Sequence, residues 1–377
     1  MNPPILDRLE RDLEKRKSEF LFRSIPLYKS ETHIDLSTNS YLDLQNCSIV
    51  RIEAARLTAA QHFGNMASRL IRQASPLYEA LEREIADWKH TESALVYNSG
   101  YAANVGVIQA ICNRHTDIFS DRLNHASIID GCTLSGGRLF RYRHNDMSDL
   151  ERLLRESSSQ DKVITTDTIF SMDGDRAPLE EICDLGRKYG CAVMVDEAHA
   201  AGIFGKTLSG LVEETGTADG IHIRIGTLSK AIAGLGGFFA GSKELRDFLV
   251  NSSRSLIYST GLPHQVLAFN LASVRFIRQN PDLGVRLLQT ADEFRSMLTS
   301  AGFDCMGSTS QIVPVAMSNS RAALELSAFL RKHNIFAPAI RPPTVPKGSE
   351  RLRFSVHLGV QKSQLEQIVS CMQKWKH

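Results

Sequence analysis

Short apolar runs alternate with helical stretches from about residue 80 onward, and this alternation limits the fold more than any other feature of the sequence. The runs lie at 94–97, 118–120, 163–165, 192–195 and 221–225. Each run is too short for a helix, and the segments between them are long enough to cross over a sheet. Strand and helix in turn predict an α/β fold with a mainly parallel central sheet and helices on both of its faces.

The length of the chain and a change of pattern near residue 260 predict more than one domain. At 377 residues the chain exceeds what a single hydrophobic core usually organises. After the segment 258–263 the sequence turns to a long helical region and then to a second alternation of helices and strands. We expect an N-terminal helix and arm at 1–38, a large domain at 39–260 and a smaller C-terminal α/β domain at 261–377.

Composition and charge exclude several classes of protein. The 44 Lys and Arg residues against 42 Asp and Glu residues give a formal charge of +2, which is too balanced for a nucleic-acid-binding surface. The seven cysteines are scattered and form no CxxC pair, which indicates a reducing compartment and no metal site. No run approaches the roughly 18 apolar residues of a spanning helix, and the first residues lack the pattern of a signal peptide. We therefore expect a cytoplasmic protein that contacts neither nucleic acid nor a membrane.

One apolar run ends abruptly in two acids and a histidine. Val193–Val195 is followed by Asp196, Glu197 and, two residues later, His199. Ligand sites in open parallel sheets gather at the carboxyl ends of the strands. A carboxylate there could keep a pyridinium nitrogen protonated, which makes such a ring an electron sink, and His199 could reach a ring hydroxyl. Alternatively, Asp196 caps the next helix and His199 is a satisfied core residue; the motif alone does not decide between the two.

A lysine among small and hydroxyl-bearing residues favours the first interpretation. Lys230 follows the segment 226–229 directly after a predicted strand, and a glycine-rich segment at 234–237 comes next. A lysine that forms imines needs a depressed pKa, which burial and neighbouring cations can supply. Thr227 is placed to contact a phosphate, and the glycines let the backbone pass close to a ligand. Although a lone lysine after a strand is usually a surface residue, we interpret Lys230 as the residue that carries pyridoxal phosphate (PLP) as a Schiff base.

Three further segments offer groups for a phosphate and a flat ring. Asn98–Asn104 follows a strand and opens a helix, so its backbone N–H groups could face an anion, although it would also serve as an ordinary helix cap. His125 lies beyond another short strand and is suited to stack on an aromatic ring. Ser171 lies in a polar segment after the run at 163–165. Each of these segments alone is ambiguous and supports a cofactor site only together with the others.

Together these segments closely resemble the α-oxoamine synthases, a family of fold-type-I PLP enzymes that join an amino acid to an acyl thioester with loss of carbon dioxide. The likeness runs from about residue 35 to the C-terminus. The matching pieces are NSGYAAN at 98–104, LNHASIIDG at 123–131, FSMDGD at 170–175, VDEAHAAGIFG at 195–205, TLSKA at 227–231, IYSTGLP at 257–263 and RPPTVPKGSERLRFS at 341–355.

The resemblance implies roles for the matching residues. Lys230 would form the internal aldimine, Asp196 would pair with the ring nitrogen and His125 would stack over the ring, and these three would be the catalytic residues. The implied cofactor-binding set is Ser99, Gly100, Tyr101, His125, Ser171, Asp196, His199, Thr227 and Lys230 from one subunit, with Ser259 and Thr260 from its neighbour. Since the family is dimeric with its sites at the subunit interface, we expect a homodimer.

The resemblance also implies substrates. FSMDGD and RPPTVPKG are most similar to family members that condense L-alanine with a pimeloyl thioester, carried by CoA or by a carrier protein, on the way to biotin. Arg353 is the expected clamp for the substrate carboxylate, because a guanidinium binds both oxygens in a fixed fork. Arg341 is the second choice for this clamp, with Thr344 beside it near the acyl chain. Asn39 and Arg23 complete the expected substrate-binding set.

Two alternatives stay open at this point. Another member of the family, such as a glycine C-acetyltransferase or a serine palmitoyltransferase, would use the same machinery with a different amino acid and acyl chain. A non-catalytic binding subunit with the PLP fold is an alternative of another class. The presence of Lys230, Asp196 and His199 argues against the second alternative, because a binding subunit has no need of an imine-forming lysine.

Overall fold

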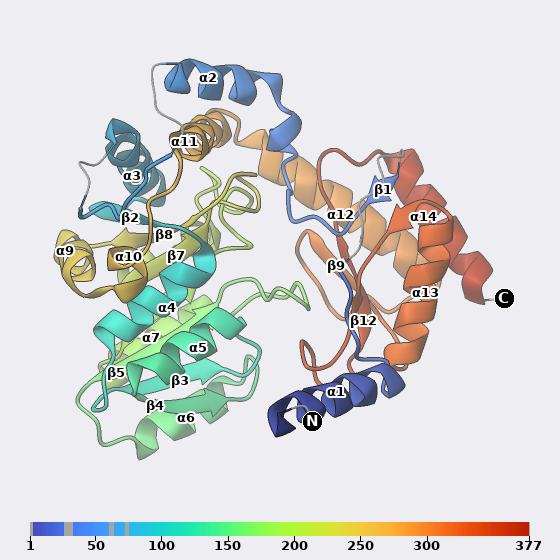
Figure 1. The fold of residues 1–377 in the computed structure, drawn as a ribbon, viewed down its shortest axis with the longest axis horizontal. Helices are drawn as coiled ribbons and strands as arrows, with labels where there is room; N and C mark the ends of the chain where they lie inside the picture. The colour runs from blue at the N-terminus through green and yellow to red at the C-terminus, as the bar shows by residue number, and fades with distance from the viewer. Residues whose placement is uncertain (1–2, 26–32, 60–63, 72–74, 377) are drawn as a thin grey trace.

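A seven-stranded sheet organises the larger part of the molecule. The structure is a computed structural model that describes residues 3–25, 33–59, 64–71 and 75–376. The strand order in this sheet is β2-β8-β7-β6-β5-β3-β4, and helices flank it (Figure 1). Its strands are β2 (Ser93–Tyr97), β3 (Asp117–Asp121), β4 (Arg138–Tyr142), β5 (Lys162–Asp167), β6 (Ala192–Asp196), β7 (Ile223–Thr227) and β8 (Gly237–Gly241).

Five neighbouring strands pair in parallel, in the order β4, β3, β5, β6 and β7, whereas β8 runs antiparallel between β7 and β2. Parallel strands bring their carboxyl ends to the same edge of a sheet. Asp121, Asp167, Asp196 and Thr227 are the last residues of β3, β5, β6 and β7, so they lie along one edge. The predicted α/β fold with a mainly parallel sheet is confirmed, and this edge is where the sequence predicts the site.

Except at the edge strand β4, both faces of the sheet are buried, and successive strand residues pack into clusters on opposite sides. Leu95 and Tyr97 of β2 belong to an apolar cluster shared with α4 (Gly100–Ile111) and α5 (Ala126–Ser135). Ala94 and Val96 belong to a second cluster, shared with α3 (Pro76–Lys89) and α7 (Leu179–Tyr189). Strands buried on two faces have continuous apolar runs rather than an alternating pattern, and the sequence shows such runs at these strands.

A smaller antiparallel sheet, β11-β12-β9, organises the C-terminal part. In Figure 1 it lies beside α12, α13 and α14, apart from the large sheet. α11 (His264–Gln279) still lies beside α3 over the large sheet (Figure 1). The elements that follow it are α12 (Asp282–Ser300), β9 (Ile312–Ala316), α13 (Ser320–Lys332), β10 (Ile335–Phe336), β11 (Ala339–Ile340), β12 (Arg351–Ser355) and α14 (Lys362–Lys376).

The N-terminal segments contact both parts of the molecule. β1 (Ile34–Asp35) pairs in parallel with β10, while α2 (Ser48–Thr58) packs against α11, which also packs against α3. The domain boundaries at 38 and 260 therefore stay predictions. The remaining elements are α1 (Pro4–Ser18), η1 (Leu44–Asn46), α6 (Met147–Glu156), α8 (Leu211–Glu214), η2 (Ala218–Gly220), α9 (Lys243–Ser252) and α10 (Arg254–Ile257). Among the described residues, every helix is too short or too polar to cross a bilayer.

Candidate active site

Asp196 ends β6 as a buried carboxylate with two hydrogen-bond donors. The side chain of Asn104, on α4, donates to Oδ2 at 2.7 Å, and the backbone N–H of Ala198 donates to Oδ1 at 2.8 Å. A carboxylate taken out of water is costly unless it is hydrogen-bonded or paired with a cation. Asp196 is therefore oriented by its donors toward the edge of the sheet, where a cationic group would be stabilised.

Lys230 and His199 meet at this edge. The Nζ atom of Lys230 lies 2.7 Å from Nε2 of His199, and Nδ1 of the same imidazole lies 2.7 Å from the hydroxyl of Tyr41. Burial lowers the pKa of Lys230 to about 8, against the opposing effect of the Asp196 charge. Burial and the neighbouring charge of Lys230 hold the pKa of His199 well below its usual value. The pair thus combines an amine that is easily deprotonated with a neutral imidazole.

His125 is the N-cap residue of α5 and is hydrogen-bonded to the last residue of β5. Its backbone N–H donates to Oδ2 of Asp167 at 2.7 Å, and its Nδ1 atom lies 2.7 Å from Oγ of Ser127. Asp167 is the register partner of Asp196 on the neighbouring strand. Burial and the adjacent Asp196 charge raise the pKa of Asp167 well above its usual value. Asp167 therefore retains its proton to a higher pH than an ordinary aspartate does.

The start of α4 lies against the end of β7. The Ser99 side chain caps the helix by accepting from the N–H of Ala102, which leaves other backbone N–H groups of the first turn pointing outward. A Cβ on Gly100 would be 3.2 Å from Cβ of Thr227, and a Cβ on Gly237 would be 2.6 Å from Cα of Gly100. Only glycine therefore fits at position 237, where the contact is with backbone, and a side chain at position 100 would press on Thr227. The helix N-terminus with the Thr227 hydroxyl beside it is suited to an anion such as phosphate.

Arg353, on β12, is a buried guanidinium that reaches the site from the smaller sheet. It donates to the backbone carbonyl of Ser171 at 2.6 Å and to Oδ1 of Asn39 at 3.1 Å. Its other acceptors are the hydroxyls of Ser355 and Tyr41. All of these acceptors are neutral, and within the described part of the chain no carboxylate forms an ion pair with Arg353. The charge is therefore available to an anionic ligand.

The segment that carries Ser171 is held from both sheets. On the side of the smaller sheet, Arg351 donates to Asp173 at 2.5 Å. On the side of the larger sheet, His144 bridges Asp121 at 3.0 Å and Asp175 at 2.8 Å. Burial alone would lower the pKa of His144, but the two carboxylates raise it to about 10. The imidazolium thus fixes the Ser171 segment to the edge of the large sheet.

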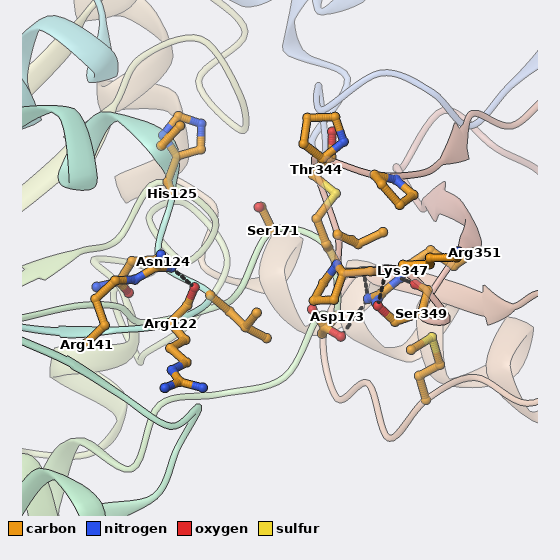
Figure 2. A pocket seen from close by; sticks show the side chains of 18 residues that line it. Arg122, Asn124, His125, Arg141, Ser171, Asp173, Thr344, Lys347, Ser349 and Arg351 are labelled. Atoms are coloured by element: carbon orange, nitrogen blue, oxygen red, sulfur yellow. Dashed lines mark hydrogen bonds and ion pairs between the residues drawn. The ribbon is translucent and has the colours of Figure 1, made fainter. Parts of the chain in front are cut away.

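A cavity of about 960 Å³ opens between this segment and the proline-rich loop at 341–348. In Figure 2, His125 and Arg122 lie on one side of the cavity and Thr344 and Lys347 on the other, with Ser171 between them. The cavity does not include Lys230, which lies deeper at the sheet edge. Of the predicted cofactor-binding residues, His125 and Ser171 line the cavity, and His125 also lies close enough to Lys230 to feel its charge.

A buried ion pair underlies the site. Glu197 follows Asp196, and its carboxylate contacts Nζ of Lys89, the last residue of α3, which also donates to the carbonyl of Ser209. Arg224 of β7 donates to the carbonyl of Lys89 at 2.6 Å. Both side chains of the pair are almost completely buried. This pair fixes the turn that presents Asp196 and His199.

Three predicted substrate-binding residues form a separate group at the proline-rich loop. Arg23 donates to the hydroxyl of Thr344 at 2.7 Å, and Arg341 donates to the backbone carbonyl of Phe20. The Nε atom of the buried Arg341 has no hydrogen-bond partner among the described residues. Of the predicted substrate-binding residues, only Arg353 and Asn39 contact each other near His199.

The predicted partner-subunit residues and Tyr101 lie at the surface. Thr260 is exposed, and its carbonyl accepts from the side chain of Asn98 at 2.6 Å, beside the cap of α4. Ser259 precedes it and is partly exposed. The hydroxyl of the half-exposed Tyr101 contacts the carboxylate of Asp130 on α5. The roles predicted for these three residues stay predictions.

Sequence reasoning missed Asp167, Asn104 and Tyr41. Asp167 could have been found, because it ends a predicted strand just as Asp196 does. Asn104 lies in the quoted NSGYAAN segment, at the position where one further helical turn brings it over Asp196. Nothing local marks Tyr41, which reaches His199 only because the N-terminal segment crosses over the site.

Comparison with known proteins agrees with the fold and identifies the family. The aminotransferase class I and II family model matches residues 31–371. The 8-amino-7-oxononanoate synthase of Citrifermentans bemidjiense is 43% identical over 376 residues, covering 96% of this chain and 96% of that protein.

Two solved structures have the same fold at 26% identity. A structure of serine palmitoyltransferase with PLP has a TM-score of 0.91 and covers 98% of this chain and 96% of its own. The 8-amino-7-oxononanoate synthase from Francisella tularensis has a TM-score of 0.79 and covers 92% of this chain and 98% of its own. The match to serine palmitoyltransferase, an α-oxoamine synthase, confirms the resemblance predicted from the motifs. The chain therefore belongs to the aminotransferase class I and II family.

Proposed function

We propose that this protein is a PLP-dependent acyltransferase that condenses L-alanine with a pimeloyl thioester, releasing carbon dioxide and the free carrier thiol and forming 8-amino-7-oxononanoate on the way to biotin. The observation that carries the proposal is the contact of Lys230 with His199 beside the buried Asp196, with the pKa of the lysine lowered to about 8. The similarity to 8-amino-7-oxononanoate synthases over nearly the whole chain supports the substrates.

The residues at the sheet edge fit PLP. A buried carboxylate at Asp196 suits a protonated ring nitrogen, and an amine of low pKa at Lys230 suits covalent attachment of an aldehyde. The start of α4, with Ser99, Gly100 and Thr227, suits the phosphate. The bound cofactor would supply an electron sink for negative charge that develops on the amino acid. His199 and Ser171 would hold the ring hydroxyl, and His125 would cover the ring.

Lys230 would move the proton in this reaction. With a pKa near 8, the amine has a substantial neutral fraction close to neutral pH and can accept the α proton of alanine. His199 stays neutral because burial and Lys230 depress its pKa, so it can accept a hydrogen bond from the lysine. Tyr41 fixes the imidazole from its other side.

Arg353 would bind the carboxylate of alanine. Its guanidinium is buried and contacts only neutral oxygens, so a carboxylate would gain a charge-assisted bidentate contact. Asn39 would move or share its hydrogen bonds when the carboxylate arrives. Arg341 and Arg23 lie beyond Thr344 and would instead contact the far end of the acyl group.

The acyl donor would enter through the 960 Å³ cavity. Leu123, Met172 and the prolines of the loop give it apolar surface for a methylene chain, while Arg122, Arg141 and Lys347 line its wall with positive charge. Both CoA and a carrier protein present a phosphopantetheine arm. Cations at the wall suit the phosphate of either one, so the cavity is compatible with both donors.

The active protein would be a homodimer with sites at the subunit interface. The isolated chain exposes Met66, Ile71 and Tyr258, and an isolated bridge joins Ser68 to Thr260 within the same region. Large exposed apolar residues gathered in one place indicate an interaction surface. Ser259 and Thr260 would reach the phosphate of the neighbouring site from this surface. Sedimentation of the purified protein tests the dimer.

The deciding experiment is incubation of the purified protein and PLP with L-alanine and pimeloyl-CoA, with the product identified by mass and carbon dioxide measured. The expected product is 8-amino-7-oxononanoate, and Lys230→Ala should form none. The structural likeness to serine palmitoyltransferase makes L-serine with palmitoyl-CoA the comparison to run in parallel. A product from serine alone would refute the proposed substrates, and no product with any pair would indicate a binding subunit.

A further inference from the structure

We propose that Asp167 is a positioning residue that fixes His125 at the wall of the site by accepting the hydrogen bond of its backbone N–H. This rests on the proposed PLP site for its functional consequence, but the positioning itself is a property of the protein alone. The acid belongs to none of the motifs from which the site was predicted. It is buried at the end of β5, in register with Asp196.

The turn that carries His125 is attached to β5 by three hydrogen bonds. The Asn124 side chain makes two of them: its Nδ2 donates to the carbonyl of Thr165 at 2.8 Å, and its Oδ1 accepts from the N–H of Asp167 at 2.9 Å. The third joins the N–H of His125 to Oδ2 of Asp167 at 2.7 Å. It is the bond of the three that holds the backbone of His125 itself.

A second series of contacts sets the direction of the imidazole. Nδ1 of His125 lies 2.7 Å from Oγ of Ser127, and that hydroxyl accepts from Nδ2 of Asn104 at 2.9 Å. Asn104 also donates to Asp196. His125 is therefore fixed at two points, its backbone to Asp167 and its ring through Ser127 and Asn104 to Asp196. His125 lines the cavity, and among the described residues its Nε2 atom makes no hydrogen bond.

The location of Asp167 indicates a specific requirement rather than a general contribution to stability. A buried carboxyl beside a second carboxylate is costly, because ionising it would place two poorly solvated negative charges side by side. Among the described residues, the Asp167 carboxyl nevertheless accepts one hydrogen bond, which comes from the backbone N–H of His125. Removing it leaves that N–H without its partner and frees the turn on one side.

The experiment compares Asp167→Ala and Asp167→Asn, each alone and combined with His125→Ala. Asp161→Ala is the matched control, because Asp161 is an exposed aspartate just before the other end of the same strand. In the cofactor-free protein, NMR of labelled histidine reports the His125 resonance, assigned by its absence in His125→Ala. In the PLP-loaded protein, kcat, the KM for alanine and the induced circular dichroism of the cofactor are measured. Thermal unfolding confirms that each variant folds.

Asp167→Ala is expected to shift the His125 resonance and lower kcat at least tenfold, equivalent to about 1.4 kcal/mol, while the KM for alanine stays within about threefold. In the His125→Ala background the same change should alter kcat less than twofold, because Asp167 acts through His125. Asp167→Asn keeps an acceptor oxygen and should restore most of the turnover, the dichroic band and the His125 resonance. Asp161→Ala should match the wild type throughout.

An unmoved His125 resonance in a folded Asp167→Ala protein would overturn the proposal, as would effects on kcat that multiply in the double variant. If Asp167→Ala does not fold, Asn124→Ala is used in its place, because it removes the other hydrogen bonds that attach the same turn to β5. Its effect on kcat is then measured alone and combined with His125→Ala, as for Asp167→Ala. Because the NMR arm uses no cofactor, a protein that failed to bind PLP would refute the proposed function while leaving this inference to be judged by its own result.

Discussion

Replacing Lys230 with methionine should stabilise the cofactor-free protein at neutral pH while abolishing its activity. Methionine has a similar length and carries no charge, so it removes a cation that folding takes out of water. Burial lowers the pKa of Lys230 from 10.5 to about 8. At about 1.36 kcal/mol for each pKa unit, this corresponds to a cost on the order of 3 kcal/mol, which partial exposure of the side chain reduces to about 2 kcal/mol.

The pH dependence of this gain identifies its cause. Between about pH 8 and pH 10.5 the lysine is protonated in the unfolded chain but largely neutral in the folded protein, so the unfolded chain binds more protons. The wild type therefore gains stability as the pH rises through this window. The cost of Lys230 is fully present below about pH 8, and the advantage of Lys230→Met should shrink toward pH 10.

The assay is urea unfolding of the cofactor-free proteins at pH 7 and pH 10, followed by fluorescence. Lys332→Met, which removes an exposed lysine, is the control and should show no such pH-dependent gain. Differences in packing between the methionine and lysine side chains contribute equally at both pH values and cancel in the comparison. A stability difference between Lys230→Met and the wild type that is the same at pH 7 and pH 10 would refute the claim that burial depresses the lysine pKa.

Three further predictions concern other parts of the site. His125→Ala should slow turnover more than it weakens PLP binding, and full turnover with excess PLP would contradict this role. Arg353→Lys keeps the charge but loses the fork, so the KM for alanine should rise about tenfold or more in steady-state assays, with PLP affinity unchanged. Lys89→Met should destabilise the protein by about 3–5 kcal/mol in chemical denaturation, because it leaves Glu197 buried without a cation, and adding Glu197→Gln should recover much of the loss.

The sequence predicts five of the seven strands because these are buried on both faces, and it misses β8 and the partly exposed edge strand β4. Continuous apolar runs locate β3, β5 and β6 to within two residues at either end. The strand predicted at 221–225 lies two residues before the observed one, because β7 extends from Ile223 to Thr227. β7 therefore includes Thr227, which the sequence places after the strand. The sequence shows β8 only as the end of the glycine-rich segment at 234–237, because a short strand that begins with Gly237 packed against the start of α4 gives little local signal.

The site was predictable where a motif follows directly from a strand, and less so where the fold joins distant segments. Lys230, Asp196 and His199 were predicted together, and the structure brings them to one edge. The contact of Tyr41 with His199 depends on the path of the N-terminal segment, which no local pattern specifies. The group around Arg341 and Arg23 depends on where the helix α1 lies against the proline-rich loop.

The wall of the cavity has two independent sources. His125 and Arg122 lie in the turn between β3 and α5, which is hydrogen-bonded to β5, so moving the backbone there would disturb the sheet edge that carries Asp196. Thr344 and Lys347 come from a loop outside both sheets, so substitutions there need not disturb either core. Natural or directed evolution can therefore change the loop residues, and with them the preferred length of the acyl chain, while the catalytic residues at the sheet edge stay the same. A library confined to residues 342–347 is therefore the economical starting point for redesigning this catalyst toward other acids.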